Sequence, residues 1–528
     1  MEVQVDLSLG LPGFNIVGLP DSACIEARVR CLTAIKNSGF TLPQKRITVN
    51  LAPAALRKEG AGFDLAIALG VLSAANLLGP RPFPEALVAG ELSLGGEVLP
   101  ARGILPIALE AHRAGFLALF VPEANAAEAQ LIQGLAVHPV RTLAQAAAHV
   151  SGEAQIEPAQ ALPSVPAPPP PDVDFADVRG QLACKRALEV AAAGAHNALL
   201  LGPPGSGKTM LARRVPGILP RLSFEEAIEA TCIWSAAGRL KPGQGLLATP
   251  PFRAPHHTIS VAGLIGGGSP PRPGEVSLAH RGTLFLDELP ELGRAALEAL
   301  RQPLEDGEVS VARLRGSAVL PARFMLIGAM NPCPCGLDGA PGPRRCFCPP
   351  AVKRAYRRRL SGPLLDRFDL HVEAPPLSPD ELCGPPDGEP SSAIRDRVER
   401  AREVQRRRYA SLPGFHANGE LRGPALRELC ALAPDAALQL RKALGKLRIS
   451  ARAHDRALKV ARTIADLDDS PLIRARHINE ALQHRALDRP LIEPPDLPPR
   501  LRAAFPALHD QHNPRADGTD PQDPQEAT

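Results

Sequence analysis

Apolar and polar residues alternate in blocks along the first 152 residues, and each block has the length of one strand or one helix. Apolar runs with the length of strands occupy residues 46–53, 86–94 and 117–122. Runs with the apolar spacing of a helix occupy residues 64–78 and 103–115. This mixture predicts a compact α/β domain over residues 1–152.

A second α/β region is predicted over residues 174–379. Its strands are short apolar runs at residues 198–201, 283–286 and 325–330. Uninterrupted apolar strands are typical of a parallel sheet that is covered on both faces. We therefore expect the ends of these strands to carry the polar chemistry of this region.

Helical spacing returns after this region and predicts a helical domain over residues 385–491. One expected helix carries an apolar stripe made of Ile449, Ala453, Ala457 and Val460. The proline-rich segment 153–173 has no apolar periodicity and predicts an extended linker. Residues 492–528 are polar and lack apolar anchors, so we expect a disordered tail.

The amino-acid composition mainly excludes certain classes of protein. The net charge of +4 and a hydrophobic content of 45% indicate a globular chain, and 528 residues are too many for one core. Aromatic residues make up only 3%, which argues against a surface built on base stacking. Ten cysteines in so long a chain do not form a secreted disulfide framework. Without a signal peptide or a long apolar run, we expect a cytoplasmic bacterial protein with no membrane partner.

The strongest motif follows the apolar strand 198–201, where a glycine-rich loop leads into a helix. Glycines let backbone N–H groups turn inward around phosphate oxygens, and the helix N-terminus adds partial positive charge. The sequence therefore predicts an ATP-binding loop, in which Lys208 reaches the β- and γ-phosphates and Thr209 binds Mg²⁺. The loop is formed by Gly202, Pro203, Pro204, Gly205, Ser206, Gly207, Lys208 and Thr209.

Two further strands end in polar residues that complete such a site. Strand 283–286 ends at Asp287, expected to hold Mg²⁺, and Glu288, expected to polarise the attacking water. Strand 325–330 ends at Asn331, which would orient that water. This order of strand ends resembles that of an AAA+ ATPase. In that class an arginine placed like Arg367 stabilises the γ-phosphate of a neighbouring subunit, so a ring is implied.

Motifs over nearly the whole chain outside the linker and tail resemble the magnesium-chelatase-like AAA+ ATPases of the bacterial competence protein ComM (YifB) family. Among them are "GLPGFNIVGLPD", "KEGAGFDLAIALG", "FRAPHHTISVAGLIGGG" and "NPCPCG". The resemblance implies a Lon-protease-like domain (1–152), an AAA+ core with a helix-2 insert and a pre-sensor hairpin (174–379), and a helical lid (385–491). Relatives usually carry one more strand before the segment that begins at Met1, so Met1 is in doubt as the true start.

The same resemblance implies a hexameric, ATP- and Mg²⁺-dependent motor that promotes branch migration during transformation and recombination. Its partners would be single-stranded or branched DNA, further copies of the chain and recombination proteins. A hairpin is expected around residues 314–317, with Arg313 and Arg315 contacting DNA phosphates; a solvated hairpin tip is the alternative. Arg452 begins a lid helix and would contact nucleotide. The basic stretches 352–360 and 400–409 are interpreted either as DNA-facing or as solvated helix faces.

Other activities are weighed against this motor. The positions that correspond to the serine and lysine of a Lon protease hold Gly62, or alternatively Phe63, and Leu105. None of these side chains can act as the nucleophile or base of that dyad, so proteolysis is not expected. The main alternative is the motor subunit of a metal chelatase-like complex. A non-catalytic assembly factor would require a defective ATP site, whereas every expected site residue is present.

Two groups of metal-binding residue types remain. Cys333, Cys335, Cys346 and Cys348 form two C-x-C pairs that can close around a structural Zn²⁺; free thiols or a redox-sensitive pair are the alternatives. His256 and His257 are adjacent, so their side chains are expected to diverge and to organise the loop rather than bind a metal together. The other six cysteines show no ligand spacing.

Overall fold

The computed structural model describes ten stretches of the chain: residues 1–79, 85–160, 173–241, 243–268, 271–313, 316–339, 345–385, 388–412, 414–447 and 450–485. The predicted linker over 153–173 is therefore described only at its two ends. The predicted tail over 492–528 lies outside the described residues. Among the described helices, none has the length and apolar character needed to cross a lipid bilayer.

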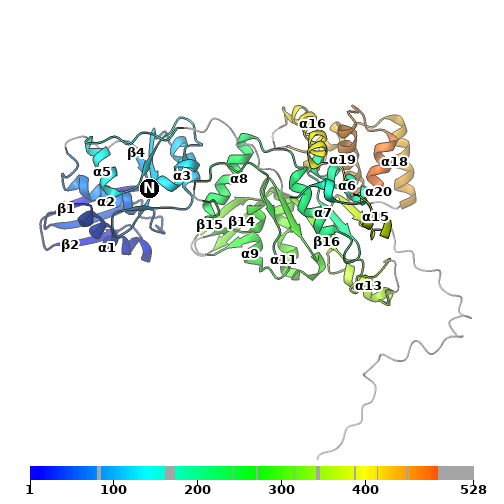
Figure 1. Cartoon of the computed structure of the whole chain (residues 1–528), viewed down its shortest axis with the longest axis horizontal. Helices are drawn as coiled ribbons and strands as arrows, with labels where there is room; N and C mark the ends of the chain where they lie inside the picture. The colour runs from blue at the N-terminus through cyan, green and yellow to red at the C-terminus, as the bar shows by residue number, and fades with distance from the viewer. Residues whose placement is uncertain are drawn as a thin grey trace, which may run out of the picture. The chain divides into compact units, whose positions relative to one another are not determined.

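The N-terminal region contains two small sheets flanked by helices (Figure 1). In the first sheet, β3 (Arg46–Ala52) lies between β1 (Glu2–Ser8), which is antiparallel to it, and β2 (Gly13–Val17), which is parallel. The second sheet is parallel, in the order β4 (Ala86–Val88), β7 (Ala118–Pro122) and β8 (Ala136–Val140). The helices are α1 (Ser22–Asn37), α2 (Asp64–Ala74), α3 (Ile104–Arg113), α4 (Ala126–Ala129) and α5 (Leu143–Ser151), with η1 at Glu123–Asn125.

The predicted α/β mixture of this region is confirmed, with one difference. The run 86–94, predicted as a single strand, forms two short strands, β4 and β5 (Glu91–Leu92). The chain leaves the second sheet after β4 because the Gly90 amide donates to the carbonyl of Gly62, outside that sheet. β5 then pairs with β6 (Val98–Leu99) as a separate antiparallel ribbon.

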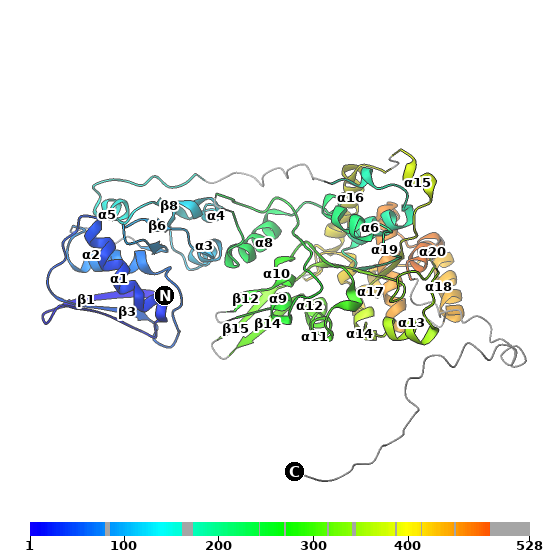
Figure 2. The same ribbon diagram turned by 60° about the horizontal axis from the view of Figure 1, so that its bottom comes forward.

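The central region is built on a five-stranded parallel sheet (Figure 2). Its order is β10 (Phe252–Arg253), β13 (Thr283–Leu286), β16 (Met325–Met330), β9 (Ala198–Leu201) and β17 (Leu370–Glu373). Every residue of β9, β13 and β16 is buried, as the apolar runs predicted. Because β9 lies between β16 and β17, the loop that follows it emerges where the strand order reverses, which is the usual ligand site of such sheets.

Short elements connect these strands. An antiparallel hairpin precedes β16, with β14 (Glu308–Arg313) paired to β15 (Gly316–Pro321). β15 begins at Gly316, inside the turn predicted for residues 314–317, and the register pairs Gly316 with Arg313. The other elements are η2 (Phe175–Asp177), α6 (Leu182–Gly194), α7 (Lys208–Arg214), η3 (Val215–Gly217), α8 (Phe224–Ala236), α9 (Val261–Ile265), β11 (Gly266–Gly267), β12 (Arg272–Pro273), α10 (Glu275–Leu278), η4 (Leu289–Glu291), α11 (Arg294–Ala299) and α12 (Arg301–Asp306).

The C-terminal region is helical, as predicted, and α16 (Ser391–Tyr409) lies near its beginning. In α19 (Ala451–Leu467) the predicted stripe residues Ala453, Ala457 and Val460 are buried, whereas Ile449 lies outside the described residues. One apolar core joins α6, β9 and β17 to α16 and α19. The remaining helices are α13 (Pro350–Arg357), α14 (Gly362–Leu365), α15 (Pro379–Cys383), η5 (Asn418–Glu420), α17 (Gly423–Leu429), α18 (Pro434–Leu447) and α20 (Ala475–Gln483).

Candidate functional site

The glycine-rich loop connects β9 to α7 at the carboxyl edge of the parallel sheet. Gly205 and Gly207 have φ angles of 80° and 85°, in the left-handed region that glycine enters without steric cost. At Gly202 a side chain would meet the carbonyl oxygen of Ala374 at 2.3 Å. The sequence places glycine where the backbone needs it, and the loop can therefore wrap closely around a ligand.

Lys208 begins α7 and is buried beneath this loop. Its Nζ donates to the carbonyl oxygens of Gly202 at 2.7 Å and Pro203 at 2.9 Å. It also donates to Oδ1 of Asn331 at 3.3 Å. Burial lowers the pKa of Lys208, and the nearby carboxylates of Asp287 and Glu288 oppose this shift. The ammonium is thus held at the mouth of the loop, where phosphate oxygens can replace the carbonyls.

The two predicted magnesium ligands meet directly. Thr209 Oγ1 donates to Oδ2 of Asp287 at 2.6 Å, although the residues are far apart in the sequence. A hydroxyl and a carboxylate are oxygen donors of the kind that Mg²⁺ takes together with phosphates and waters. The donor chemistry and the closeness of the two oxygens therefore fit a magnesium ion bound with a nucleotide.

Glu288 follows Asp287 in a left-handed backbone conformation with φ of 48°, which is uncommon outside glycine. Its carboxylate lies 3.3 Å from Nδ1 of His257. No local sequence signal predicts this pairing, because the partners lie on different loops. The expectation that the two adjacent histidines diverge is wrong, since the ring centroids of His256 and His257 are only 4.1 Å apart. His257 instead holds the carboxylate predicted to act on water.

Asn331 follows β16 directly, at the same edge of the sheet as the phosphate loop. The structure therefore brings together Lys208, Thr209, Asp287 and Asn331 through hydrogen bonds, with Glu288 adjacent. The sequence did not identify the buried Tyr356 of α13, whose pKa is raised to about 12 by burial and by the negative charge of Glu291. Such burial depends on tertiary packing and has no local sequence signal.

Arg367 and Arg452 lie at the opposite, amino edge of the sheet. Arg367 precedes β17, whose first residue is in register with the first residue of β9, and its guanidinium pairs with Glu305. Arg452 donates to Asp366, the residue before Arg367, at 3.0 Å. Although burial alone raises the pKa of Asp366, hydrogen bonds from Arg456 and Arg452 hold it below its usual value. The structure thus places Arg452 beside Arg367 and not at the phosphate loop of its own chain.

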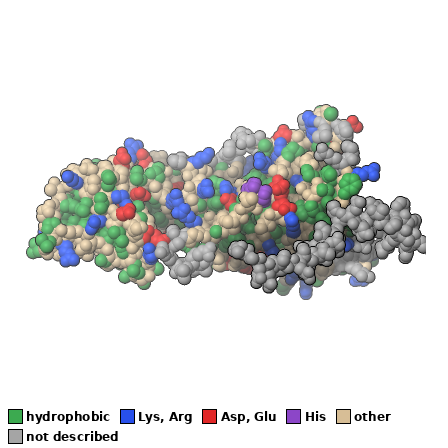
Figure 3. All heavy atoms as spheres, turned by 90° about the horizontal axis from the view of Figure 1, so that it is seen from below, with side chains coloured by type: hydrophobic (Ala, Val, Ile, Leu, Met, Phe, Trp, Pro, Cys, Tyr) green, Lys and Arg blue, Asp and Glu red, His purple; other side chains and the backbone are tan. Residues whose placement is uncertain are grey.

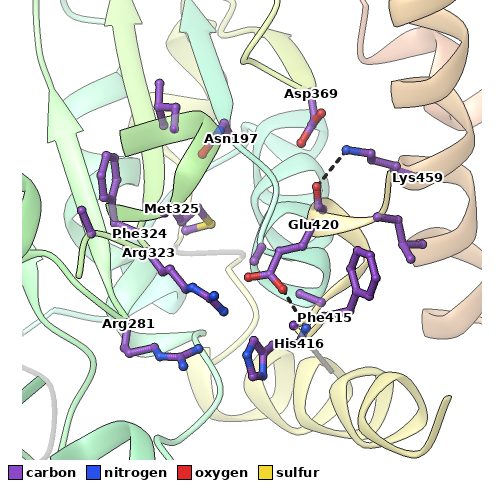
Figure 4. Close-up of a pocket in the computed structure, with 18 of the residues that line it drawn as sticks. Asn197, Arg281, Arg323, Phe324, Met325, Asp369, Phe415, His416, Glu420 and Lys459 are labelled. Atoms are coloured by element: carbon purple, nitrogen blue, oxygen red, sulfur yellow. Dashed lines mark hydrogen bonds between the residues drawn. The ribbon is translucent and has the colours of Figure 1, made fainter. Parts of the chain in front are cut away.

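A cleft of about 870 Å³ opens at this amino edge, between the sheet and the helical region (Figure 4). Asn197, just before β9, lies in its wall and accepts a hydrogen bond from the Leu326 amide. The amide nitrogen of Asn197 donates to the carbonyl oxygen of Arg367 and so fixes the turn that carries this arginine. Arg281 and Arg323 also line this cleft, and Arg281 pairs there with the acidic residue Glu229.

Three family models match successive parts of the chain. "Subunit ChlI of Mg-chelatase" matches residues 3–125, "Magnesium chelatase, subunit ChlI" residues 174–382, and "Magnesium chelatase, subunit ChlI C-terminal" residues 388–485. An uncharacterised protein of Mycobacterium tuberculosis (strain H37Rv) is 48% identical over 88% of this chain and 92% of its own length. YifB of Escherichia coli K12 is 44% identical over 93% and 95%. Competence protein ComM of Haemophilus influenzae is 42% identical over 92% and 94%.

The chain belongs to the magnesium chelatase-like ComM/YifB family. Two further relatives match smaller parts of the chain. A Lon protease of Salinispora arenicola is 28% identical over 27% of the chain and 20% of that protein. The magnesium-chelatase 38 kDa subunit of Rhodobacter capsulatus is 29% identical over 40% of the chain and 58% of that subunit. Both matches agree with the Lon-like and chelatase-like motifs.

In this ComM/YifB chain, the positions matched to the Lon dyad lie in the N-terminal region. Leu105 is fully buried in α3, and Gly62 has no side chain. Phe63, the alternative match to the serine, precedes α2. The buried Lys58 donates to the carbonyl oxygen of Pro53. These contacts are those of a packed domain and supply no nucleophile at the matched positions.

The predicted DNA-contacting residues cannot be placed in full. Arg315 lies outside the described residues, and for Arg313 only the backbone, at the end of β14, is described. Several arginines of the basic stretches form ion pairs: Arg359 pairs with Glu291, Arg406 and Arg407 pair with Glu403, and Arg408 pairs with the buried Asp466. These pairs favour the interpretation of the stretches as solvated helix faces offset by nearby acids.

The four C-x-C cysteines converge after Asn331, as the spacing allowed. Of the remaining six, Cys24, Cys31, Cys184 and Cys430 are buried, while Cys232 is half-buried and Cys383 is exposed. Burial raises the pKa of Cys184 and of Cys430 to about 12, so these thiols stay protonated and unreactive at neutral pH.

Proposed function

We propose that this protein is an ATP-dependent, ring-forming DNA motor of the helicase or branch-migration type that acts in natural transformation and homologous recombination. Membership of the AAA+ magnesium chelatase-like family implies an ATPase and points to ATP and Mg²⁺ as its ligands. The observation that carries the ring is the separation of the two basic groups. Lys208 lies at the carboxyl edge of the sheet, whereas Arg367 and Arg452 lie at the amino edge.

This separation supports a site that is completed by a second copy of the chain. Phosphoryl transfer needs positive charge on both sides of the γ-phosphate. Lys208 would supply one side, and a bound Mg²⁺, held by Thr209 and Asp287, would neutralise charge between the β- and γ-phosphates. Arg367 of a neighbouring copy would supply the other side. Because Arg452 donates to Asp366 beside Arg367, it would act on the same neighbour, and a closed homo-hexamer is the proposed assembly.

Within one copy, the remaining groups would act on water. Glu288 is placed to accept a proton from the attacking water, and His257 orients its carboxylate at 3.3 Å. Asn331 would hold that water while its Oδ1 also contacts Lys208. In this arrangement the residues that act on water, the phosphate loop and the metal ligands all follow adjacent strands of the sheet. Contact with one neighbouring copy of the chain would then complete the site.

DNA as the client is proposed on two grounds. The first is the relative named competence protein ComM, at 42% identity over most of both chains. The second is the β14–β15 hairpin immediately before β16, because a strand that ends at the ATP site can couple hydrolysis to hairpin movement. Figure 3 shows Lys and Arg side chains mixed with Asp and Glu on the face it presents. We assign contact with DNA phosphates to this hairpin, because it immediately precedes β16.

The experiment is a comparison of ATP hydrolysis with and without single-stranded, forked and four-way DNA. We expect DNA to stimulate hydrolysis, and ATP to drive strand displacement on the forked and four-way substrates. The Lys208→Ala protein should show neither. Hydrolysis that ignores every nucleic acid would contradict the DNA motor.

The motor subunit of a metal chelatase-like complex remains the second candidate. It is favoured by the family model that matches residues 174–382 and by the similarity to the Rhodobacter capsulatus subunit over 40% of the chain. The two candidates differ in what stimulates hydrolysis: DNA for the motor, and a chelatase partner protein for the alternative. The same assay with a purified magnesium chelatase partner in place of DNA separates them.

Replacing Asn331 with alanine should reduce ATP turnover by about 100-fold, the usual cost of one lost polar contact in a transition state. Nucleotide binding should change little, because the phosphate loop and Lys208 remain. Turnover and the binding of a fluorescent nucleotide are the measurements. Asn479→Ala, an exposed asparagine of α20, is the matched control. Unchanged turnover in the Asn331 variant would remove this residue from the site.

A further inference from the structure

Four cysteines gather in the loop after β16: Cys333, Cys335, Cys346 and Cys348. Their sulfur atoms all lie within 4.8 Å of one another. The Cys333 sulfur is 3.3 Å from that of Cys335 and 3.6 Å from that of Cys346, and the last two are 3.6 Å apart. Disulfide-bonded sulfurs would be about 2.0 Å apart. Sulfurs about 2.3 Å from a tetrahedral zinc ion are about 3.8 Å apart, so the separations of 3.3 Å and 3.6 Å are closer to those of a zinc site than to those of a disulfide.

We propose that these four cysteines bind one structural zinc ion, and that this ion holds the loop carrying Asn331 against the phosphate loop. Four thiolates leave no open coordination position, so the ion would have no direct part in hydrolysis. Soft sulfur ligands in a tetrahedron select zinc over hard cations such as Mg²⁺. The metal site stands independently of the ATPase, whereas its effect on turnover rests on the proposed function.

The backbone after Asn331 turns tightly and so brings the first two sulfurs together. Cys333 and Gly336 close this turn, in which the Gly336 amide donates to the Cys333 carbonyl at 2.9 Å. Gly336 has a φ of 76°, a left-handed conformation that favours glycine. Cys335 lies inside the turn, and its sulfur is 3.3 Å from that of Cys333.

The cysteine loop is in direct contact with the candidate ATP site. Cys333 is fully buried and lies two residues after Asn331. A side chain at Gly336 would come within 2.6 Å of the Pro204 ring, so the loop backbone packs on the phosphate loop itself. On the other side, Asp338 pairs with Lys353 of α13 at 2.5 Å. A zinc ion here would fix the position of Asn331 relative to the bound phosphates.

Metal analysis of the purified full-length protein, kept reduced and free of chelators, tests the site directly. We expect one zinc per chain. Cys335→Ser should lose it, while Cys383→Ser, which changes an equally exposed cysteine outside the cluster, should retain it. Replacement by Co²⁺ should produce the thiolate charge-transfer and intense d–d bands of a tetrahedral tetrathiolate. These measurements on the unaltered chain do not depend on how well a variant folds.

Three results would overturn the zinc site: a reduced protein that takes up no zinc when zinc is in excess, two disulfides among the four cysteines, or iron as the resident metal. For the coupling, removing zinc reversibly should lower kcat by about tenfold or more with little change in KM, and added zinc should restore it. Zinc-independent turnover would overturn the coupling alone. A zinc-loaded protein with no hydrolysis would instead overturn the proposed function and leave the metal site standing.

Discussion

Replacing Lys208 with alanine should reduce ATP turnover by at least about 100-fold and abolish ATP-driven DNA displacement. The ammonium is the cation held at the mouth of the phosphate loop, bonded to the carbonyls of Gly202 and Pro203 and to Asn331. Without this ammonium, the negative charge that develops on the phosphates loses the cationic side chain that the same chain supplies. Steady-state hydrolysis and displacement of a forked duplex are the measurements.

The control for this variant is Lys442→Ala, an exposed lysine of α18 in the helical region. It should leave turnover unchanged, and thermal unfolding should show that both variants are folded. A Lys208→Ala protein that retains normal hydrolysis would mean that the glycine-rich loop does not bind the reacting phosphates. The assignment of Thr209 and Asp287 as magnesium ligands would then also be wrong.

Replacing Arg367 with alanine should also abolish turnover, but this defect should be repairable by a neighbour. An arginine supplied across an interface contributes about 10³- to 10⁵-fold in rate. The Arg367→Ala chain keeps an intact phosphate loop, whereas the Lys208→Ala chain keeps an intact Arg367. In a 1:1 mixture assembled at random, about a quarter of the interfaces combine an intact loop with an intact arginine. We therefore expect the mixture to regain about a quarter of the normal turnover.

The same mixing experiment assigns Arg452. The structure bonds Arg452 to Asp366 beside Arg367, so Arg452→Ala should likewise be rescued by Lys208→Ala. If Arg452 acted on the nucleotide of its own chain, no mixture of these two variants could contain a complete site. Arg301→Ala, an exposed arginine that pairs with Glu298, is the control and should need no rescue. If both mixtures assemble and neither regains ATP turnover, the proposal that two neighbouring chains form each ATP site would be contradicted.

The sequence alone was sufficient for the fold class and for one half of the candidate ATP site. Every residue of β9, β13 and β16 is buried, which requires a nearly continuous apolar run in the sequence. The end of each apolar run therefore located the end of the strand. Gly202 to Thr209, Asp287 and Asn331 follow those ends without a gap. Strands of one parallel sheet bring their carboxyl ends to one edge, which explains why the residues that follow them meet in the structure.

Only the tertiary structure showed at which edge of the parallel sheet each basic side chain of the candidate site lies. Arg452 lies on a helix that begins far along the chain from the sheet, and its bond to Asp366 depends on how α19 packs against the core. The contacts of His257 with Glu288 and of Gly336 with Pro204 join separate loops in the same way. Strand ends follow from local patterns of apolar residues. Contacts between loops follow from the packing of whole elements, which no local pattern contains.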